Sequence, residues 1–427
     1  MKDINIGIMG MGTVGSGVYR VIEKEGAYIQ HKEDVQIHVK KVLALDYSIE
    51  IPEEKKTSSI EDIVTDPDIS IVVEVMGGIE PAKTFIIKCL RAGKTVVSAN
   101  KQLISQYWAE IEQEAKKTGA GFYFEASVGG GIPILRAVNE SMQANTINSI
   151  YGIINGTTNY ILTKMSDEGR DLQDVLKEAQ ALGYAEANPT ADVDGYDAMY
   201  KLSILGSMAF HVRLPVEHIY REGIMKVSKE DIDGARELGM VVKLLAIGKR
   251  KGEEVQVRVH PTMIPKDHPL ASVKGSYNAI MLNGSAVDDV MFYGKGAGDL
   301  PTASAIVSDI VVASKTKEHK YATFMNEPAK VSPTLSFDNN WEAGFYVRLR
   351  VADRPGTLSK ITGVFGDNNV SLTSVIQKAT DGKVATVVLV THLSKELDVK
   401  AALEGLQNLD EVVEIGNVMR VENLTCD

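Results

Sequence analysis

A lysine near residue 100 lies where a side-chain amine could contact a bound small molecule. Lys101 follows the short apolar run 94–97, which predicts a strand. Open α/β sheets bind ligands at the carboxyl ends of their strands, so an amine just beyond such an end is well placed to meet one. A solvated surface lysine is the alternative for this residue taken alone, because lysine side chains are mostly exposed.

A glycine-rich motif near the N-terminus is typical of a dinucleotide-binding loop. Gly10, Gly12 and Gly15 form the pattern GxGxxG, after an apolar strand at 5–9 and before an amphipathic helix. Gly10 permits a tight turn, Gly12 lets a pyrophosphate approach the backbone, and Gly15 lets helix and strand pack closely. The N–H groups at the start of the helix would bind the phosphates. A plain glycine turn is the alternative.

The end of the second predicted strand bears on the choice of nucleotide. This strand, 39–45, leads to Asp46, and an acidic residue there commonly binds the ribose 2′-hydroxyl, which favours NAD over NADP. The sequence separation between Gly15 and Asp46 exceeds the usual spacing of about 20 residues. We attribute the excess to a longer helix and a loop over 23–36. An aspartate in a solvated turn is an equally good interpretation.

The remainder of the first domain has the βαβαβ order of a parallel sheet. The predicted elements after residue 68 are a strand at 69–75 ending in Met76, Gly77 and Gly78, a helix from Pro81 to Arg91, the strand 94–97, a helix at 104–117 and a strand at 121–125. We therefore expect a Rossmann-type parallel sheet over residues 1–130.

Three polar or glycine-rich segments stand out in the middle of the chain. Gly129–Gly131 follow a predicted strand, which suggests backbone placed against a ligand or ion; an interdomain hinge is the alternative. Asn155–Asn159 can cap the helix that follows. Gly296–Gly298 lead into a helix with proline in its first turn, a second helix N-terminus suited to phosphate or nicotinamide.

An acidic stretch follows at 192–197 and leads into a probable helix. Asp197 and Lys201 are four residues apart on that helix, whose other face is apolar. At this spacing an exposed ion pair is common and contributes only about 0.3–0.5 kcal/mol, which is the plain interpretation of these two residues alone.

Composition narrows the class of protein. The 427 residues leave room for roughly three domains. A net charge of −11 with no basic stripe argues against a nucleic-acid partner. Cys89 and Cys426 are too few for a disulfide framework or a zinc site, which indicates a reducing, cytoplasmic location. Neither a signal peptide nor an apolar run of about 18 residues is present, so we expect no membrane association.

Taken together, these segments resemble homoserine dehydrogenases over residues 7–310. The motifs that carry the resemblance, in the order and spacing of that family, are GxGxxG, Ser98–Lys101, Gly129–Pro133, Asn155–Asn159, Gly183–Glu186, Asp192–Lys201 and the run from Gly296 to Ala303. Each motif is short, but the combination is highly specific. The resemblance implies reversible hydride transfer between L-homoserine and L-aspartate 4-semialdehyde with NAD or NADP, a step towards threonine, methionine and isoleucine.

The resemblance also implies roles for individual residues. Lys101 and Lys201 would be catalytic, because a lysine beside the reacting oxygen can exchange its proton and stabilise a developing alkoxide. Glu186, Asp192 and Asp197 would bind the substrate, with Glu186 at its amino group. The residues expected at the cofactor are Gly10, Gly12, Thr13, Val14, Gly15, Asp46, Gly77, Ser98, Lys101 and Gly298.

The same resemblance implies a monovalent cation, sodium or potassium. Glu125 and the backbone of Val128, Gly130 and Ile132 correspond to the family's cation site, and oxygen ligands of this kind suit a hard ion. One departure concerns the nucleotide: many members have a basic residue just after the second strand, whereas this chain has Asp46, which tilts the prediction towards NAD.

The C-terminal part has the pattern of a separate module. After a polar linker at 315–340 that contains Pro328 and Pro333, the predicted order over 345–427 is βαββαβ, with Asp381 and Gly382 as a hairpin turn. This order, with the turn Asp353–Gly356, resembles an ACT domain, and the resemblance implies an amino-acid effector, with threonine expected. A module that only helps the chain to oligomerise is the alternative.

The expected architecture is therefore α/β with three domains. They are a Rossmann-type NAD(P)-binding domain at 1–130, completed by the helix after 299, an α+β substrate-binding and dimerisation domain at 131–320, and a ferredoxin-like ACT domain at 345–427. A homodimer or homotetramer is expected. Two other functions compete: a 2-hydroxy-acid dehydrogenase, for which no histidine has a suitable motif, and an inactive sensor that binds nucleotide and amino acid.

Overall fold

The chain divides into two compact units, neither of which is a continuous stretch of sequence. The computed structural model describes residues 2–326, 335–378 and 382–424. The first unit comprises 1–150, 199–219 and 277–333, and the second comprises 151–198, 220–276 and 334–427. Strand β7 (Ile147–Ile153) and helix α9 (Tyr196–Phe210) run through the division.

A six-stranded parallel sheet forms the centre of the first unit, in the order β3-β2-β1-β4-β5-β6. This is the predicted Rossmann-type sheet, with β1 flanked by β2 and β4. Its central strands are apolar on both faces because helices cover both sides. The bounds are β1 Lys2–Met9, α1 Thr13–Glu33, β2 Val35–Leu43, β3 Lys56–Thr57, α2 Glu61–Val64, β4 Ile69–Glu74, α3 Ala82–Arg91, β5 Thr95–Ser98, α4 Lys101–Thr118 and β6 Phe122–Tyr123.

Two differences from the predicted boundaries affect proposed site residues. Helix α1 continues to Glu33 and β2 begins at Val35, so the excess spacing before Asp46 is almost entirely helix rather than helix and loop. Helix α4 begins at Lys101, because the side chain of Asn100 accepts a hydrogen bond from the Leu103 N–H at 3.2 Å and caps the helix there. Lys101 is thus the first residue of a helix rather than a loop residue.

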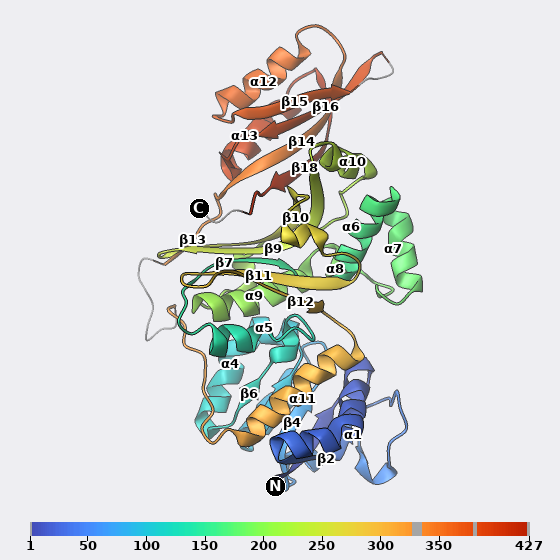
Figure 1. The fold of residues 1–427 in the computed structure, drawn as a ribbon, viewed down its shortest axis with the longest axis vertical. Coiled ribbons are helices and arrows are strands. Elements are labelled where there is room, and N and C mark those ends of the chain that lie inside the picture. The colour runs from blue at the N-terminus through green and yellow to red at the C-terminus, as the bar shows by residue number, and fades with distance from the viewer. Residues whose placement is uncertain (1, 327–334, 379–381, 425–427) are drawn as a thin grey trace. The chain divides into compact units, whose positions relative to one another are not determined.

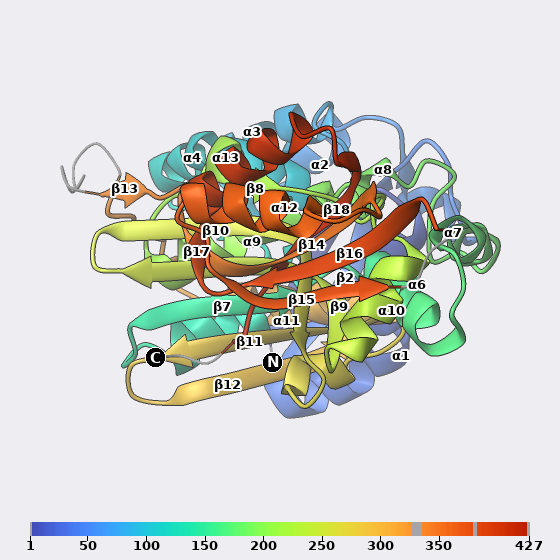
Figure 2. The ribbon, with the colours of Figure 1, turned by 90° about the horizontal axis from the view of Figure 1, so that it is seen from above.

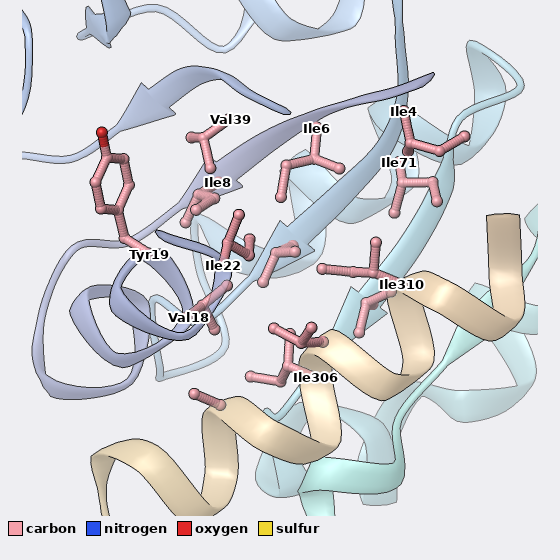
Figure 3. Packing of buried hydrophobic residues seen from close by; sticks show 14 of the residues in the cluster. Ile4, Ile6, Ile8, Val18, Tyr19, Ile22, Val39, Ile71, Ile306 and Ile310 are labelled. Atoms are coloured by element: carbon pink, nitrogen blue, oxygen red, sulfur yellow. The ribbon is translucent and has the colours of Figure 1, made fainter. Parts of the chain in front are cut away.

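Helix α11 (Asp299–Lys315) returns to this sheet from late in the sequence. It packs beside α1, and Figure 1 shows the two helices next to each other in the first unit. Ile306 and Ile310 of α11 lie in one buried cluster with Ile71 and Val18 (Figure 3). The apolar stripe of α11 therefore completes the core that β1, β4 and α1 leave open.

The first unit also contains the antiparallel hairpin β11–β12, in which Asn278 is paired with Gly294. Short elements of this unit include a 3₁₀ turn at Glu125–Ser127, α5 Ile134–Arg136 and a π-helical turn at Ala137–Ser141. Strand β11 spans Tyr277–Gly284 and β12 spans Asp288–Lys295.

The second unit contains a mixed sheet whose strand order is β9-β10-β18-β14-β16-β15. Helices α6 and α7 pack against each other, and the two-residue strands β8 and β13 each pair with β10. The bounds are α6 Gly156–Glu168, α7 Leu172–Ala181, α8 Thr190–Val193, β8 Tyr220–Arg221, α10 Lys229–Glu237, β9 Met240–Lys251, β10 Glu254–Pro265 and β13 Ser336–Phe337.

The C-terminal module has the predicted βαββαβ order. Its four main strands lie in the order β18-β14-β16-β15, and Figure 2 shows β14, β16 and β15 side by side. Asp381 of the predicted hairpin turn, and Pro328 and Pro333 of the predicted linker, lie outside the described residues. The bounds are β14 Glu342–Ala352, α12 Thr357–Asp367, β15 Leu372–Lys378, β16 Val384–Thr391, β17 Ser394–Lys395, α13 Glu396–Gln407 and β18 Val412–Val421.

A buried carboxylate joins this module to helix α10. Asp231 is fully buried and accepts hydrogen bonds from Arg348 Nε at 2.7 Å and from Asn417 Nδ2 at 2.8 Å. It also accepts one from the Ser228 N–H at 2.9 Å, which completes the capping box of α10. Each oxygen of this carboxylate therefore has charged or polar donors in place of water.

We expect Asp231→Ala to destabilise the second unit strongly, because it leaves the buried Arg348 without its main partner. The cost should be roughly 3–5 kcal/mol, seen as a lower urea midpoint of the intact chain. Asp233→Ala is the matched control, because Asp233 is in the same helix and pairs with Arg236 in a half-exposed contact, for which about 0–1 kcal/mol is expected. Equal shifts in the two variants would contradict the role given to Asp231.

Candidate functional site

The turn between β1 and α1 has room for a ligand on one side only. A Cβ on Gly15 would lie 2.1 Å from the Gly10 carbonyl oxygen, whereas a Cβ on Gly12 would meet nothing within 4 Å. No side chain caps α1 at Gly12, so the first-turn N–H groups of Thr13 and Val14 point out of the helix end. These features fit a pyrophosphate lying against Gly12 at the helix N-terminus.

Three other predicted cofactor residues lie in loops of the same unit. Asp46 is exposed in the loop after β2, and that loop is tied to the glycine turn by the Ser48 N–H, which donates to the Met11 carbonyl at 3.2 Å. Gly77 follows β4 with open space where a Cβ would be. Gly298 precedes α11, whose first residue, Asp299, accepts a hydrogen bond from Arg20 of α1 at 2.8 Å.

The segment Ser98–Lys101 is organised around a buried glutamate. Ser98 is fully buried, and its hydroxyl donates to Glu74 at 2.6 Å. Asn100 binds both neighbours, because its N–H donates to Ser98 Oγ at 3.1 Å and its side chain donates to the Gly78 carbonyl at 2.7 Å. Burial raises the pKa of Glu74. The Ser98 hydroxyl is therefore engaged in positioning the turn before Lys101.

The predicted cation loop lies beside two further buried carboxylates, Glu125 and Asp309. Glu125 accepts hydrogen bonds from the N–H groups of Leu135 at 3.0 Å and Arg136 at 2.7 Å. Asp309 accepts one from the Glu125 N–H at 3.0 Å and pairs with the Arg136 guanidinium at 2.6 Å. Burial, and next the nearby Asp309, raises the pKa of Glu125 to about 7, while burial raises that of Asp309 to about 6.

Both Glu125 carboxylate oxygens accept backbone hydrogen bonds, and a cation in this loop would draw its other oxygen ligands from the backbone. The loop lies against the second glycine-rich segment: a Cβ on Gly130 would be 2.5 Å from the Gly296 carbonyl oxygen. Asn278, beside Gly296, is buried, and its amide has no hydrogen-bond partner among the residues that the structure describes. A hard cation prefers oxygen ligands. Such oxygens are available here from the carbonyls of Val128, Gly130 and Ile132 and from the side-chain amide of Asn278.

Among the described residues, no group of three or more histidine, cysteine, aspartate or glutamate side chains could hold a metal ion.

A cavity of about 440 Å³ in the first unit is lined in part by Glu125, Asp309 and Arg136, with the aromatic rings of Trp108 and Tyr123. None of the predicted catalytic or substrate-binding residues lines it.

In the second unit, one amide holds two of the predicted substrate carboxylates together. Asn155 Nδ2 donates to Asp192 Oδ1 at 2.7 Å and to Asp197 Oδ2 at 2.9 Å. The side-chain oxygen of Asn155, Oδ1, accepts a hydrogen bond from the Thr158 N–H at 2.8 Å and so caps α6, as the sequence predicts. Asp197 is buried and Asp192 partly buried. The three residues form a hydrogen-bonded cluster that contains two carboxylates.

The other predicted residues lie beside or after this cluster in the sequence. Glu186 is exposed in the loop after α7, and its backbone carbonyl accepts from Gln180 Nε2 at 3.1 Å. That loop is linked to the start of α6 through Thr157, whose hydroxyl donates to the Tyr184 carbonyl at 2.6 Å. Lys201 is buried, in the same helix as Asp197.

Sequence reasoning missed two residues that organise these segments. Glu74 is a charged residue at the end of a largely apolar strand, and that contrast was the available signal. Asn155 was assigned only a capping role, and no local pattern indicates that its amide nitrogen binds Asp192 and Asp197, 37 and 42 residues away.

Comparison with known proteins identifies the family. Three family models match: the homoserine dehydrogenase NAD-binding domain over 10–125, homoserine dehydrogenase over 133–311, and the ACT domain over 345–411. The chain is 40% identical to a homoserine dehydrogenase of Bacillus subtilis over 99% of both chains. The chain belongs to the homoserine dehydrogenase family. Another family member, from Synechocystis, is 43% identical over 98% of this chain and 99% of its own.

Solved structures of homoserine dehydrogenases agree with this result. A homoserine dehydrogenase from Thiobacillus denitrificans is 38% identical, with a TM-score of 0.92 over 100% of this chain and 99% of that one. A hyperthermophilic archaeal homoserine dehydrogenase in complex with NADPH is 29% identical, with a TM-score of 0.64 over 74% of this chain and 99% of that one. The predicted family, the α/β fold with an NAD(P)-binding and an ACT domain, and an oxidoreductase function are therefore confirmed.

Of the helices in the described part of this homoserine dehydrogenase family member, none combines the length and apolar character needed to cross a bilayer.

We expect Gly15→Ala to weaken nucleotide binding, because its Cβ would overlap the Gly10 carbonyl and displace the turn. The dissociation constant of reduced nicotinamide nucleotide, measured by fluorescence titration, should rise at least about tenfold, or about 1.4 kcal/mol. Gly26→Ala is the control, because Gly26 is in the same helix with nothing within 4 Å of a Cβ. A Gly15→Ala protein that binds like Gly26→Ala would disprove the assigned role of this turn.

Proposed function

We propose that the chain catalyses the reversible interconversion of L-homoserine and L-aspartate 4-semialdehyde, in the pathway to threonine, methionine and isoleucine. Family membership supports the reaction class, and the Asn155–Asp192–Asp197 cluster is the observation that supports an amino-acid substrate. Two carboxylates held by one amide offer a negative site to the substrate ammonium group. Glu186, in the neighbouring loop, is proposed as a further contact to that group.

The two lysines are proposed to manage the proton of the reacting hydroxyl. During oxidation, the hydroxyl of homoserine loses its proton to a lysine amine as the carbinol carbon loses a hydride; in the reverse direction the lysine returns the proton. The positive charge of the other lysine would stabilise the developing alkoxide. Burial of Lys201 and the position of Lys101 at a helix start after β5 support these roles for the pair.

The nicotinamide nucleotide, when bound, accepts or supplies the hydride. Gly10, Gly12 and Gly15 with the N–H groups of Thr13 and Val14 are proposed to hold its phosphates. Gly77, Ser98 and Gly298 are proposed to flank it through their backbones. Asp46 would bind the ribose 2′-hydroxyl and favour NAD, whereas a family neighbour is named as a complex with NADPH, so use of both nucleotides is part of the proposal.

A sodium or potassium ion is proposed at Glu125 and the carbonyls of Val128, Gly130 and Ile132. The ion would hold the Gly129–Gly131 loop against the segment at Gly296 and so fix the backbone before α11. The hydrogen bonds to both Glu125 carboxylate oxygens, which hold that side chain in place, support its part in the site.

Amino-acid regulation is proposed to act through the ACT domain, with threonine as the effector and the turn Asp353–Gly356 at its site. The protein is proposed to work as a homodimer or homotetramer. An ACT domain that serves only assembly is the second possibility for this module, and a sensor without turnover is the second possibility for the whole chain.

Loss of the Lys101 amine should abolish turnover while nucleotide binding survives. The expected fall in kcat with homoserine for Lys101→Ala is well beyond tenfold, a factor that corresponds to about 1.4 kcal/mol of barrier, followed as nicotinamide absorbance in sodium or potassium buffer. Lys117→Ala, at the other end of the same helix and paired with Glu114, should keep normal turnover. Persistence of turnover in Lys101→Ala would remove Lys101 from the mechanism, and no turnover in the unsubstituted protein would favour the sensor.

Threonine should inhibit the unsubstituted protein, and Asp353→Ala should reduce that inhibition without changing turnover in the absence of threonine. The reason is that Asp353 lies in the turn proposed for the effector, where its side chain accepts from Gln377 at 3.1 Å. Asp367→Ala, at the exposed end of α12, is the control. If threonine has no effect while chromatography shows an oligomer that depends on the ACT domain, the assembly role is favoured.

A further inference from the structure

The segment 220–224, here called the brace, contacts the backbone that carries the two clustered carboxylates. The Arg221 guanidinium donates from Nη1 to the Asp194 carbonyl. The same guanidinium lies 3.6 Å from the centre of the Tyr196 ring, well within the range of a cation–π contact. Further along, the Ile224 N–H donates to the Val193 carbonyl at 2.8 Å. These contacts involve Val193, Asp194 and Tyr196, which lie between Asp192 and Asp197 in the sequence.

The backbone of the brace and the backbone of residues 193–195 lie so close together that a shift of one requires a shift of the other. A Cβ on Gly223 would lie 2.3 Å from the Val193 carbonyl oxygen and 2.4 Å from Asp194 Cα. Gly195 has φ +82°, and a Cβ there would be 3.5 Å from both Arg221 Cγ and the Glu222 carbonyl oxygen. The brace is therefore in direct steric contact with the turn that leads into α9.

The brace is itself held in the second unit. Strand β8 pairs with β10, with Arg221 opposite Val259. Arg420 of β18 is buried, donates to the Tyr220 hydroxyl at 2.8 Å and forms an ion pair with Glu222. The residues on both sides of Arg221 are thus fixed by the last strand of the ACT domain, which leaves Arg221 little freedom other than its side-chain rotamer.

We propose that Arg221 is a positioning residue for the substrate carboxylates, acting through the backbone at 194–196. Asp192 and Asp197 share the Asn155 amide, so their relative placement depends on the backbone between them. A guanidinium that binds the intervening carbonyl and ring fixes that backbone and sets the direction in which α9 begins. The inference rests on the proposed function, because Asp192 and Asp197 are assigned to the substrate there. It adds a residue that the sequence motifs do not include.

The test compares Arg221→Met, which keeps the bulk but removes charge and donors, with Arg221→Lys, which keeps the charge. Steady-state kinetics of the full chain with homoserine should show a KM for homoserine raised at least about tenfold in Arg221→Met, which is about 1.4 kcal/mol. The KM for the nucleotide should stay within about twofold, and Arg221→Lys should recover part of the loss. Arg350→Ala, an exposed arginine of β14, is the control and should match the unsubstituted protein.

Variants of Tyr196 keep the proposal testable if Arg221→Met does not fold. Tyr196→Leu removes the ring under the guanidinium and should raise the KM for homoserine by a smaller factor, whereas Tyr196→Phe retains the ring and should leave it unchanged. Thermal unfolding of each variant separates a local effect from loss of the fold.

The proposal is overturned if folded Arg221→Met and Tyr196→Leu keep the KM for homoserine, or if both substrates lose affinity equally. Asp197→Asn distinguishes this failure from failure of the proposed function. If Asp197→Asn raises the KM for homoserine while Arg221→Met does not, only the role of Arg221 is wrong. If Asp197→Asn also has no effect, the substrate assignment itself is wrong.

Discussion

A charged side chain can be buried only where other groups replace the water that it loses, and this constraint shapes both units. In the first unit, Glu74 is satisfied by Ser98 and the Met76 N–H, and Asp309 by Arg136 and the Glu125 N–H. In the second, Asp231 is satisfied by Arg348 and Asn417. Each of these contacts fixes a turn or helix start, because the partner atoms must stay within hydrogen-bond distance.

The segments with proposed chemical roles are built on such contacts. The turn before Lys101 depends on the bond between Ser98 and Glu74, and the Gly129–Gly131 loop lies next to the elements that Glu125 and Asp309 hold. The clustered carboxylates Asp192 and Asp197 depend on a neutral amide instead. The amide fixes the position of the two carboxylates relative to each other.

The ACT domain is connected to the rest of the second unit by buried charged groups rather than by apolar packing alone. Arg348 reaches α10, Arg420 reaches the segment at Tyr220–Glu222, and Arg258 of β10 pairs with Glu422. The three arginines lie on strands that belong to one continuous sheet. A change in the geometry of the ACT strands would alter ion pairs that are costly to break. One of these pairs, Arg420–Glu222, lies next to Arg221, which contacts the segment between Asp192 and Asp197.

The sequence by itself determined the family, the parallel sheet of the first unit, the βαββαβ order of the ACT domain and the cap at Asn155. Apolar runs, glycine spacing and capping residues are local signals, and they set backbone conformation and burial directly. The tertiary structure alone decided that Ser98 binds Glu74, that Asn155 joins Asp192 to Asp197, and that Arg221 contacts Asp194 and Tyr196. Such partners lie about 24 to 42 residues apart, and their meeting depends on how packed elements are oriented, which no local pattern specifies.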